Sequence, residues 1–253
     1  MRVELKAVTK GRKGRALPET SVAYRSGTAV LAAAETEQRP TVLGLLASGR
    51  MVPDSGTVLI DGRADASALR RRIALVDAPD VSDPDSSVLL AGIVSEELMF
   101  AGRRSNPLAA WRWLDELGLK GLATTPIANV GPAERLRVLC ELAVLRKGVE
   151  GIVLVAPDRH GGEPLVWWRL AQEFAARGLA VLVIAGYASE WSIRHEQSLK
   201  DIAEAEASLG EALGAFDERE AAWAQSGGAP LFGGTPEITP PGADSSIPGE
   251  EPK

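Results

Sequence analysis

The hydrophobic pattern predicts a set of short strands, two of them buried on both faces. Apolar and polar residues alternate near the start of the chain, as in VELKAV at 3–8, which is typical of strands with one face in a core. GIVLVAP at 151–157 and LAVLVIAG at 179–186 are continuously apolar, and a helical pattern at 164–178 separates them. The other expected strands lie at 16–24, 28–34, 57–62 and 73–76. Strand, crossover helix and strand together indicate a parallel sheet.

Helical spacing predicts one helix at 41–51, mainly helical structure over 86–147, and a long polar helix over 190–225. Apolar residues recur along the long helix at spacings of three and four, with Glu206 and Glu220 at two positions of the same series. These apolar residues, which we call the seam, are Leu199, Ile202, Leu209, Leu213, Phe216 and Trp223. Such a helix either packs on its own domain or joins a partner helix in a short coiled coil.

The end of the chain has the composition of a disordered tail. Residues 226–253 contain 12 Pro and Gly among 28 residues and one aromatic residue, Phe232. Such a segment buries too little apolar surface to offset the loss of chain entropy on ordering. We therefore expect disorder there.

Composition narrows the classes of function. The chain has 253 residues with a net charge of −6 from 28 basic and 34 acidic residues, which argues against a general nucleic-acid binder. One cysteine excludes a disulfide framework and a cysteine-built metal cluster within one chain, and two histidines are too few for most histidine metal sites. No apolar run approaches the length of a membrane span, and the N-terminus lacks a signal-peptide pattern. We expect a soluble intracellular protein that meets a membrane only through a partner.

A series of segments follows in a recognisable order over the first 186 residues. They are VELKAVTKG, RSGTAVLAA, PDSGTVLIDG at 53–62, LRRRIALV at 69–76, WLDELGL at 113–119, AERLRV at 133–138 and RGLAVLVIAG at 177–186. This order resembles the nucleotide-binding subunit of ABC transporters. The resemblance implies a P-loop NTPase-like α/β fold with an N-terminal β subdomain, a parallel core sheet with flanking helices, and a helical subdomain.

The resemblance also implies domain boundaries. An ABC ATPase-like domain covers 1–188, with its helical subdomain at about 86–147. A long amphipathic helix covers 189–225, and the Pro/Gly-rich tail covers 226–253.

The phosphate loop that this family uses is altered. Its pattern falls on Ala34–Thr41, where the glycine positions hold Ala34 and Arg39 and the lysine position holds Pro40. Such a loop binds phosphate through converging backbone N–H groups and the lysine, and proline removes one of those N–H groups. Glu35 and Glu37 add negative charge beside the place of a triphosphate. Arg39 and Thr41, vestigial phosphate-loop positions, are the expected cofactor-binding residues.

The other catalytic motifs of the family are altered too. The magnesium-binding Asp of Walker B falls on Ala156 and the Glu beside it on Pro157, while Asp158 lies one residue away. Neither Ala nor Pro coordinates a metal or accepts a proton. Ala78 stands where the family has a glutamine, and Gly186 stands where it has its last histidine. The signature loop corresponds to Val130–Glu134, and Gly11-Arg12 occupies the place of the aromatic residue that stacks on adenine. We expect no catalytic residue and no metal site, with Mg-ATP binding weak at most, as in a pseudo-ATPase.

Four tryptophans are candidates for a partner surface. Trp111 and Trp113 lie in the helical insertion, which in the resembled family docks on the membrane subunit. Two residues apart, they point in different directions on a helix, so we expect one of them to be exposed, and we expect the same of Trp167 and Trp168. The alternative is that all four pack within their own domain.

Three further residues have simpler interpretations. His160 and Asp158 form a conceivable acid/base pair, but without a nucleophile or a third member a polar loop is the preferred interpretation. Cys140 lies between leucines and is expected to be a small buried hydrophobic residue. His195 is expected to be solvated.

These observations leave three functions open. The first is a non-catalytic ABC-type subunit that acts as scaffold or regulator of a polytopic membrane subunit or of an intact ABC ATPase. The second is an ATP-binding subunit that hydrolyses ATP at a composite site with an intact partner ATPase. The third is a homodimeric interaction protein. The first two place the chain in the cytoplasm, at the inner face of the cell membrane when a partner holds it there.

Overall fold

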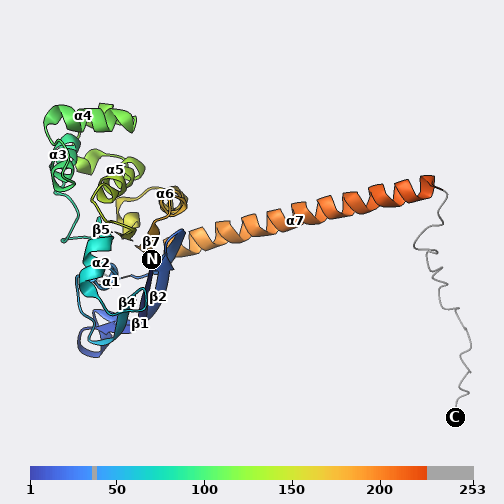
Figure 1. Ribbon diagram of the computed structural model, residues 1–253, viewed down its shortest axis with the longest axis horizontal. Helices are drawn as coiled ribbons and strands as arrows, with labels where there is room; N and C mark the ends of the chain where they lie inside the picture. The colour runs from blue at the N-terminus through green and yellow to red at the C-terminus, as the bar shows by residue number, and fades with distance from the viewer. Residues whose placement is uncertain (36–38, 227–253) are drawn as a thin grey trace, which may run out of the picture. The chain divides into compact units, whose positions relative to one another are not determined.

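A computed structural model describes residues 1–35 and 39–226 (Figure 1). Contacts divide the chain into two compact units, Met1–Gln197 and Ser198–Lys253, and in the second unit residues 198–226 are described. The disorder expected at 226–253 falls, apart from Ser226, on residues outside the described part of the chain.

An antiparallel sheet of three strands in the order β2-β1-β4 belongs to the first unit. Its strands are β1 (Arg2–Lys10), β2 (Leu17–Arg25) and β4 (Ser55–Ile60). In the central strand, Val3 pairs with Tyr24 on one side and with Ile60 on the other. All three of these residues are buried, which explains the alternating pattern in the sequence.

A parallel sheet of four strands in the order β3-β7-β6-β5 lies beside it. Its strands are β3 (Thr28–Ala33), β5 (Ile73–Val76), β6 (Gly151–Val155) and β7 (Ala180–Ala185). Every residue of β6 and β7 is buried, as their continuous hydrophobicity predicts.

Helices cover the parallel sheet on both faces. The helices on the sheet are α1 (Arg39–Ala47), α2 (Ala66–Arg72), α5 (Pro132–Val144) and α6 (Pro164–Ala176). Outside them, α3 (Leu90–Phe100) packs on α5, and α4 (Pro107–Glu116) packs on α3. One core cluster joins the sheet to α3, α4, α5 and α6, and a second joins it to α1 and the antiparallel sheet. Within the first unit, Figure 1 shows α3 and α4 at the end opposite β1 and β4.

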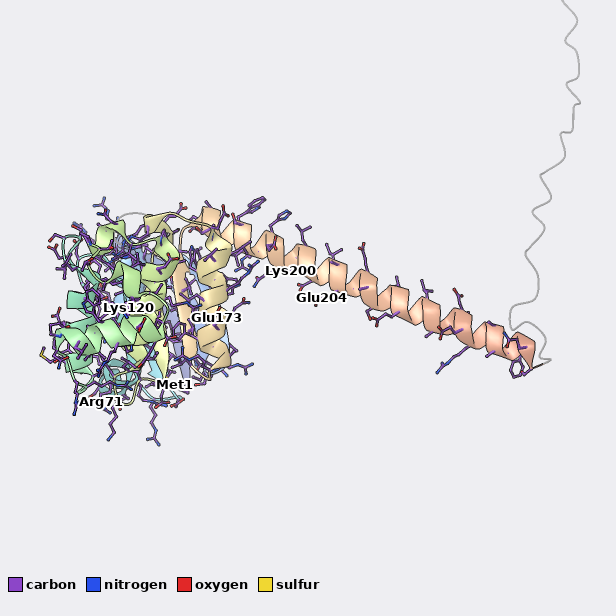
Figure 2. All side chains as sticks on the ribbon, turned by 90° about the horizontal axis from the view of Figure 1, so that it is seen from above. Met1, Arg71, Lys120, Glu173, Lys200 and Glu204 are labelled. Carbon is purple, nitrogen blue, oxygen red and sulfur yellow. The ribbon has the colours of Figure 1, made fainter. Side chains whose placement is uncertain are left out.

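Helix α7 (Tyr187–Gln225) begins in the first unit and runs through the described part of the second. It starts three residues before the expected Glu190. The seam side chains are between 47% and 62% exposed. Figure 2 shows side chains projecting from several sides of this helix, Lys200 and Glu204 among them. What the seam packs against stays a prediction.

No helix in the described ranges combines the length and the hydropathy needed to cross a bilayer.

Candidate functional site

The carboxyl ends of the parallel strands bring together residues that lie far apart in the sequence. Glu35 follows β3, Asp77 follows β5, Asp158 follows β6 and Gly186 follows β7. In open α/β sheets, ligands bind at this edge. The expected Walker B positions and those of the family's glutamine and last histidine fall at this edge, so the contacts of the residues here decide what the site can do.

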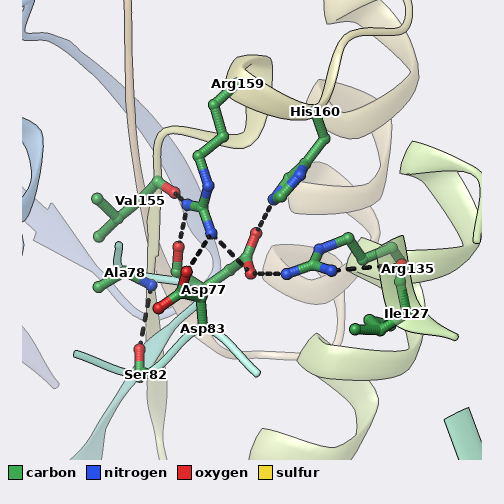
Figure 3. Close-up of polar contacts among 9 residues, drawn as sticks. All are labelled: Asp77, Ala78, Ser82, Asp83, Ile127, Arg135, Val155, Arg159 and His160. Atoms are coloured by element: carbon green, nitrogen blue, oxygen red, sulfur yellow. Dashed lines mark hydrogen bonds and ion pairs between the residues drawn. The ribbon is translucent and has the colours of Figure 1, made fainter. Parts of the chain in front are cut away.

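Asp77 is the centre of a buried polar network (Figure 3). Its side chain is 0% exposed. Arg135 of α5 donates to Asp77 Oδ1 from Nη2 at 2.8 Å, and His160 Nε2 lies 2.7 Å from Asp77 Oδ2. Arg159 Nη2 lies 3.1 Å from Oδ1, and Arg159 Nη1 donates to the backbone carbonyl of Asp77. The network therefore ties a helix of the outer layer to two strand ends.

The electrostatics of Asp77 favour its charged form. Burial opposes ionisation, but the hydrogen bonds from His160 and Arg135 and the charge of Arg159 outweigh it, so the pKa of Asp77 lies below its ordinary value of 3.8. The side chain of Arg135 is only 6% exposed, and its Nη1 also donates to the carbonyl of Ile127 at 3.5 Å. The carboxylate of Asp77 is therefore paired with two arginines of its own chain.

Two other carboxylates bind the start of α7. Asp158 Oδ2 accepts a hydrogen bond from Gly186 N at 2.8 Å and lies 3.2 Å from Ser189 Oγ, which donates to it. Glu35 Oε1 accepts from Tyr187 N at 2.9 Å. The first N–H groups of a helix lack partners within the helix and attract anions, so the two side chains cap α7. They take the place at which a helix N-terminus would bind phosphate.

Gly186 allows this arrangement. A Cβ atom at this position would lie 3.0 Å from Asp158 Oδ2 and 3.2 Å from Glu35 Oε1. A larger side chain, such as the histidine of the resembled family, would displace one or both carboxylates.

The vestigial phosphate-loop residues lie at the start of α1. Thr36–Gln38, and with them Glu37, lie outside the described residues. Arg39 and Thr41 occupy the first turn of α1, and Arg39 Nε is buried without a hydrogen-bond partner among the described residues. Pro40, between them, has no N–H to offer a phosphate. Whether Arg39 and Thr41 bind a nucleotide stays a prediction.

The two expected Walker B positions, Ala156 and Pro157, contain no metal-binding side chain. Ala156 and Pro157 connect β6 to a short 3-10 helix, η4 (Pro157–His160), and Ala156 has a positive φ of 46°. At the start of α5, the Glu134 carboxylate lies so close to Gly131 that a Cβ there would collide with it. Within the described ranges, no group of three His, Cys, Asp or Glu residues could hold a metal ion.

The expected pairing of His160 with Asp158 does not form. His160 contacts Asp77, while Asp158 contacts the start of α7. Sequence reasoning missed Asp77 and Arg135. The available signal was a charged residue directly after the apolar strand IALV, and an arginine on the apolar face of a helix that must be buried.

The two tryptophan pairs lie on different helices and differ in exposure. Trp111 on α4 is 39% exposed, whereas Trp113 is partly buried against the core. For the second pair the expectation was wrong, because Trp167 and Trp168 are both buried. They are adjacent on α6, which contacts both the sheet and α5, so two neighbouring directions on this helix face the core.

Cys140 and His195 lie as expected from the sequence. Cys140 is buried, and burial raises the pKa of its thiol, so it is a core residue as predicted. His195 is exposed and stacks on Trp191 with ring centroids 5.0 Å apart.

Comparison with known proteins finds similarity in structure. No family model matches the chain, and no curated protein does. A nucleotide-free ATP-binding cassette from an ABC transporter matches with a TM-score of 0.50 and 16% identity over 74% of this chain and 82% of that one. The fold is that of an ATP-binding cassette. CbiO1 from Clostridium perfringens, part of the ABC transporter complex CbiONQ, matches with a TM-score of 0.51 and 18% identity over 73% of this chain and 77% of its own.

These matches confirm the expected fold class, an α/β fold with a parallel sheet and flanking helices like that of P-loop ABC ATPase domains. The chain is thus similar to ATP-binding subunits of ABC transporters. At identities of 16% and 18% the likeness concerns the fold.

Proposed function

We propose that this chain is a non-catalytic subunit of the ABC-transporter type, which acts as scaffold or regulator of a membrane transport partner. One observation carries the proposal: the carboxylates at the strand ends all bind groups of their own chain. Asp77 binds two arginines and His160, Asp158 binds Gly186 and Ser189, and Glu35 binds the start of α7.

Phosphoryl transfer depends on positive groups and a magnesium ion that offset the charge of the phosphates. At this edge Glu35 and Asp158 place negative charge instead, and each close carboxylate–phosphate pair repels by roughly a kcal/mol or more. Asp158 uses Oδ2 for both of its contacts, so it could bind a metal through both carboxylate oxygens only after giving them up. The fold supports a scaffold whose strand ends stabilise the protein itself.

A partner surface on the helical layer supports the same proposal. Trp111 and Leu108 on α4 and Phe100 at the end of α3 are exposed apolar side chains. Exposed aromatic residues are enriched in protein interfaces. We assign this surface to a polytopic membrane subunit or an intact ABC ATPase, which would hold the chain at the inner face of the cell membrane, and we assign no nucleic-acid partner.

Phosphate release from Mg-ATP tests the proposal. The purified full-length chain should release no phosphate above a protein-free blank. Turnover that is abolished by Asp158→Asn or Thr41→Ala would overturn the proposal. Turnover that requires both Thr41 and an added intact ATPase would instead support an ATP-binding subunit with a composite site.

The exposed seam favours a second candidate function, a homodimeric interaction protein. Its spacings of three and four repeat every seven residues, so all its members lie on one face of α7. In a parallel dimer, Glu206 would face Glu206 of the second copy. In an antiparallel dimer centred near Glu211, Glu206 would face Phe216 of the second copy, with Arg219 of that copy beside it.

Sedimentation of two matched variants tests this candidate. Leu209→Glu/Leu213→Glu places charge in the seam, whereas Ala207→Glu/Ala215→Glu places the same charge on other faces of α7. A homodimer should become monomeric in the first variant and stay dimeric in the second. A wild-type chain that sediments as a monomer at high concentration would exclude this candidate.

A further inference from the structure

Six cationic side chains line one pocket at the opposite end of the parallel strands from the site above. The pocket has a volume of about 590 Å³ and lies between the end of α1, the end of α2 and the loop from α5 to β6. We call it the arginine pocket. Its cationic residues are Arg50, Arg70, Arg71, Arg72, Arg146 and Lys147. This concentration of positive charge contrasts with the net charge of −6 of the whole chain.

Carboxylates neutralise only two of these cations. Arg72 is paired with Asp61 and with Glu150, each at 2.7 Å, and Arg146 is paired with Glu97 at 2.6 Å. Within the described part of the chain, no carboxylate lies within ion-pair distance of the other four, Arg50, Arg70, Arg71 and Lys147. The pocket therefore carries unbalanced positive charge.

Backbone carbonyls hold two of the unbalanced arginines in place. Arg50 Nη1 donates to the carbonyl of Ile73 at 3.1 Å and to that of Ser48 at 3.2 Å, and Arg70 Nη1 donates to the carbonyl of Gly49 at 3.0 Å. The pKa of Arg50 lies below its ordinary value because of burial and then because of the positive charges of Arg146 and Arg70. Like charges are thus held near one another, at an electrostatic cost that a bound anion would offset.

Helix dipoles favour each of these cations locally. Arg70, Arg71 and Arg72 lie in the last turn of α2, and Arg50 and Lys147 follow the C-terminal ends of α1 and α5, where positive charge is favourable too. The dipoles do not explain why three helix ends are arranged so that their cations line one pocket.

We propose that the arginine pocket binds a phosphate-bearing anion. The planar fork of a guanidinium group matches phosphate oxygens with two parallel hydrogen bonds, and several arginines around one concavity suit a group with more than one negative charge. Arg71, at the rim, extends from the edge of the domain in Figure 2. The phosphate comes either from a soluble compound or from a lipid headgroup at a membrane surface, which share this chemistry.

Two charge-reversal variants of the full-length chain distinguish binding at the arginine pocket from nonspecific attraction of anions to positive charge. Arg71→Glu/Lys147→Glu changes two exposed pocket residues, and within residues 1–35 and 39–226 their one side-chain hydrogen bond goes from Arg71 to Ser67 Oγ. Arg12→Glu/Arg15→Glu makes the same change of charge in an exposed turn before β2. The probes are sodium pyrophosphate by calorimetry, and vesicles of phosphatidylcholine with or without phosphatidic acid by co-sedimentation.

Wild type and the Arg12/Arg15 variant should bind one or both phosphate probes, and the Arg71/Lys147 variant should bind at least about tenfold more weakly. Binding of pyrophosphate identifies a soluble ligand, and binding only of vesicles with phosphatidic acid identifies a headgroup. Equal weakening in both variants, or no binding of either probe by wild type, would overturn the proposal. Binding of a polyglutamate peptide without either phosphate probe would overturn it in favour of an acidic protein partner.

Discussion

At the scale of single residues, the contacts of Asp77 stabilise the fold. Its carboxylate is fully buried, and Arg135, Arg159 and His160 compensate for the loss of water. A buried ion pair adds little compared with an apolar core, but removing one partner leaves an uncompensated buried charge. Asp77 directly precedes Ala78, the position that corresponds to the resembled family's glutamine, and its contacts hold its own chain together.

Replacing Asp77 should therefore be costly. Asp77→Asn should lower the free energy of unfolding by about 3–5 kcal/mol, because Arg135 keeps its charge without a counter-ion. Urea denaturation followed by tryptophan fluorescence measures this change. The control is Asp83→Asn, which removes a partly exposed carboxylate 3.5 Å from Arg159 and should cost less than about 1 kcal/mol. Equal costs for the two variants would contradict the assigned role of Asp77.

The same residue predicts a pH dependence. The pKa of Asp77 is lowered in the folded state, so its contribution is complete above its unfolded value near 3.8 and is lost as the pH falls through the folded value. Wild type should lose stability relative to Asp77→Asn only below about pH 4. Urea midpoints of both proteins across this range check the prediction. A difference that stays constant down to low pH would contradict it.

Asp77 also marks the limit of sequence reasoning at the residue scale. Cys140 was predictable because apolar neighbours on a helix indicate burial. The network around Asp77 joins residues 58 and 83 positions apart, and nothing in local spacing encodes such contacts. The fold had to bring β5, α5 and η4 together first.

At the scale of elements, the start of α7 is built by residues from two other strand ends. Glu35→Ala and Asp158→Ala should each lower the free energy of unfolding by about 1 kcal/mol, because each removes an acceptor of a helix N-cap. Hydrogen exchange at Gly186 and Tyr187 should become faster.

Glu163 provides the matched control for this prediction. It stands at the N-cap of α6 without a side-chain hydrogen bond to the helix, so Glu163→Ala should change stability by no more than about 0.5 kcal/mol. A cost for Glu163→Ala equal to that for Asp158→Ala would show that the capping contacts contribute nothing.

The helical layer offers a second test at this scale. Trp167→Ala should cost about 3–5 kcal/mol because it empties part of the core, whereas Trp111→Ala should cost about 0.5 kcal/mol or less. Thermal and urea denaturation of both variants measure the difference. Trp111→Ala should still weaken binding to a membrane subunit or ATPase partner, and retained binding would remove Trp111 from the proposed interface.

Most elements could be predicted because their patterns are periodic and long. The strand at Ile73–Val76 has the expected bounds, and β6 and β7 match their apolar runs. The expectation for Trp167 and Trp168 failed because periodicity shows which residues share a face of a helix, but not how many faces are covered. Helix α6 contacts two neighbours, and only the tertiary structure supplies the second.

At the scale of the whole molecule, an ATP-binding cassette fold coexists with strand ends that bind their own chain. The fold could be predicted from the order of segments, since seven short patterns had to agree. The contacts of Glu35 and Asp158 with the start of α7 could not be predicted, because they join residues far apart in the sequence. These contacts make the central claim testable, because a nucleotide at the strand ends would have to displace Glu35 and Asp158.

A Mg-ATP titration followed by the melting temperature tests this claim most directly. It compares wild type with Thr41→Ala and with the pocket variant Arg71→Glu/Lys147→Glu, since a ligand bound to the native state must stabilise it. We predict that any rise in melting temperature is lost in the pocket variant and unchanged in Thr41→Ala. A rise that persists in the pocket variant and disappears in Thr41→Ala would show a working nucleotide site at the strand ends and contradict the account.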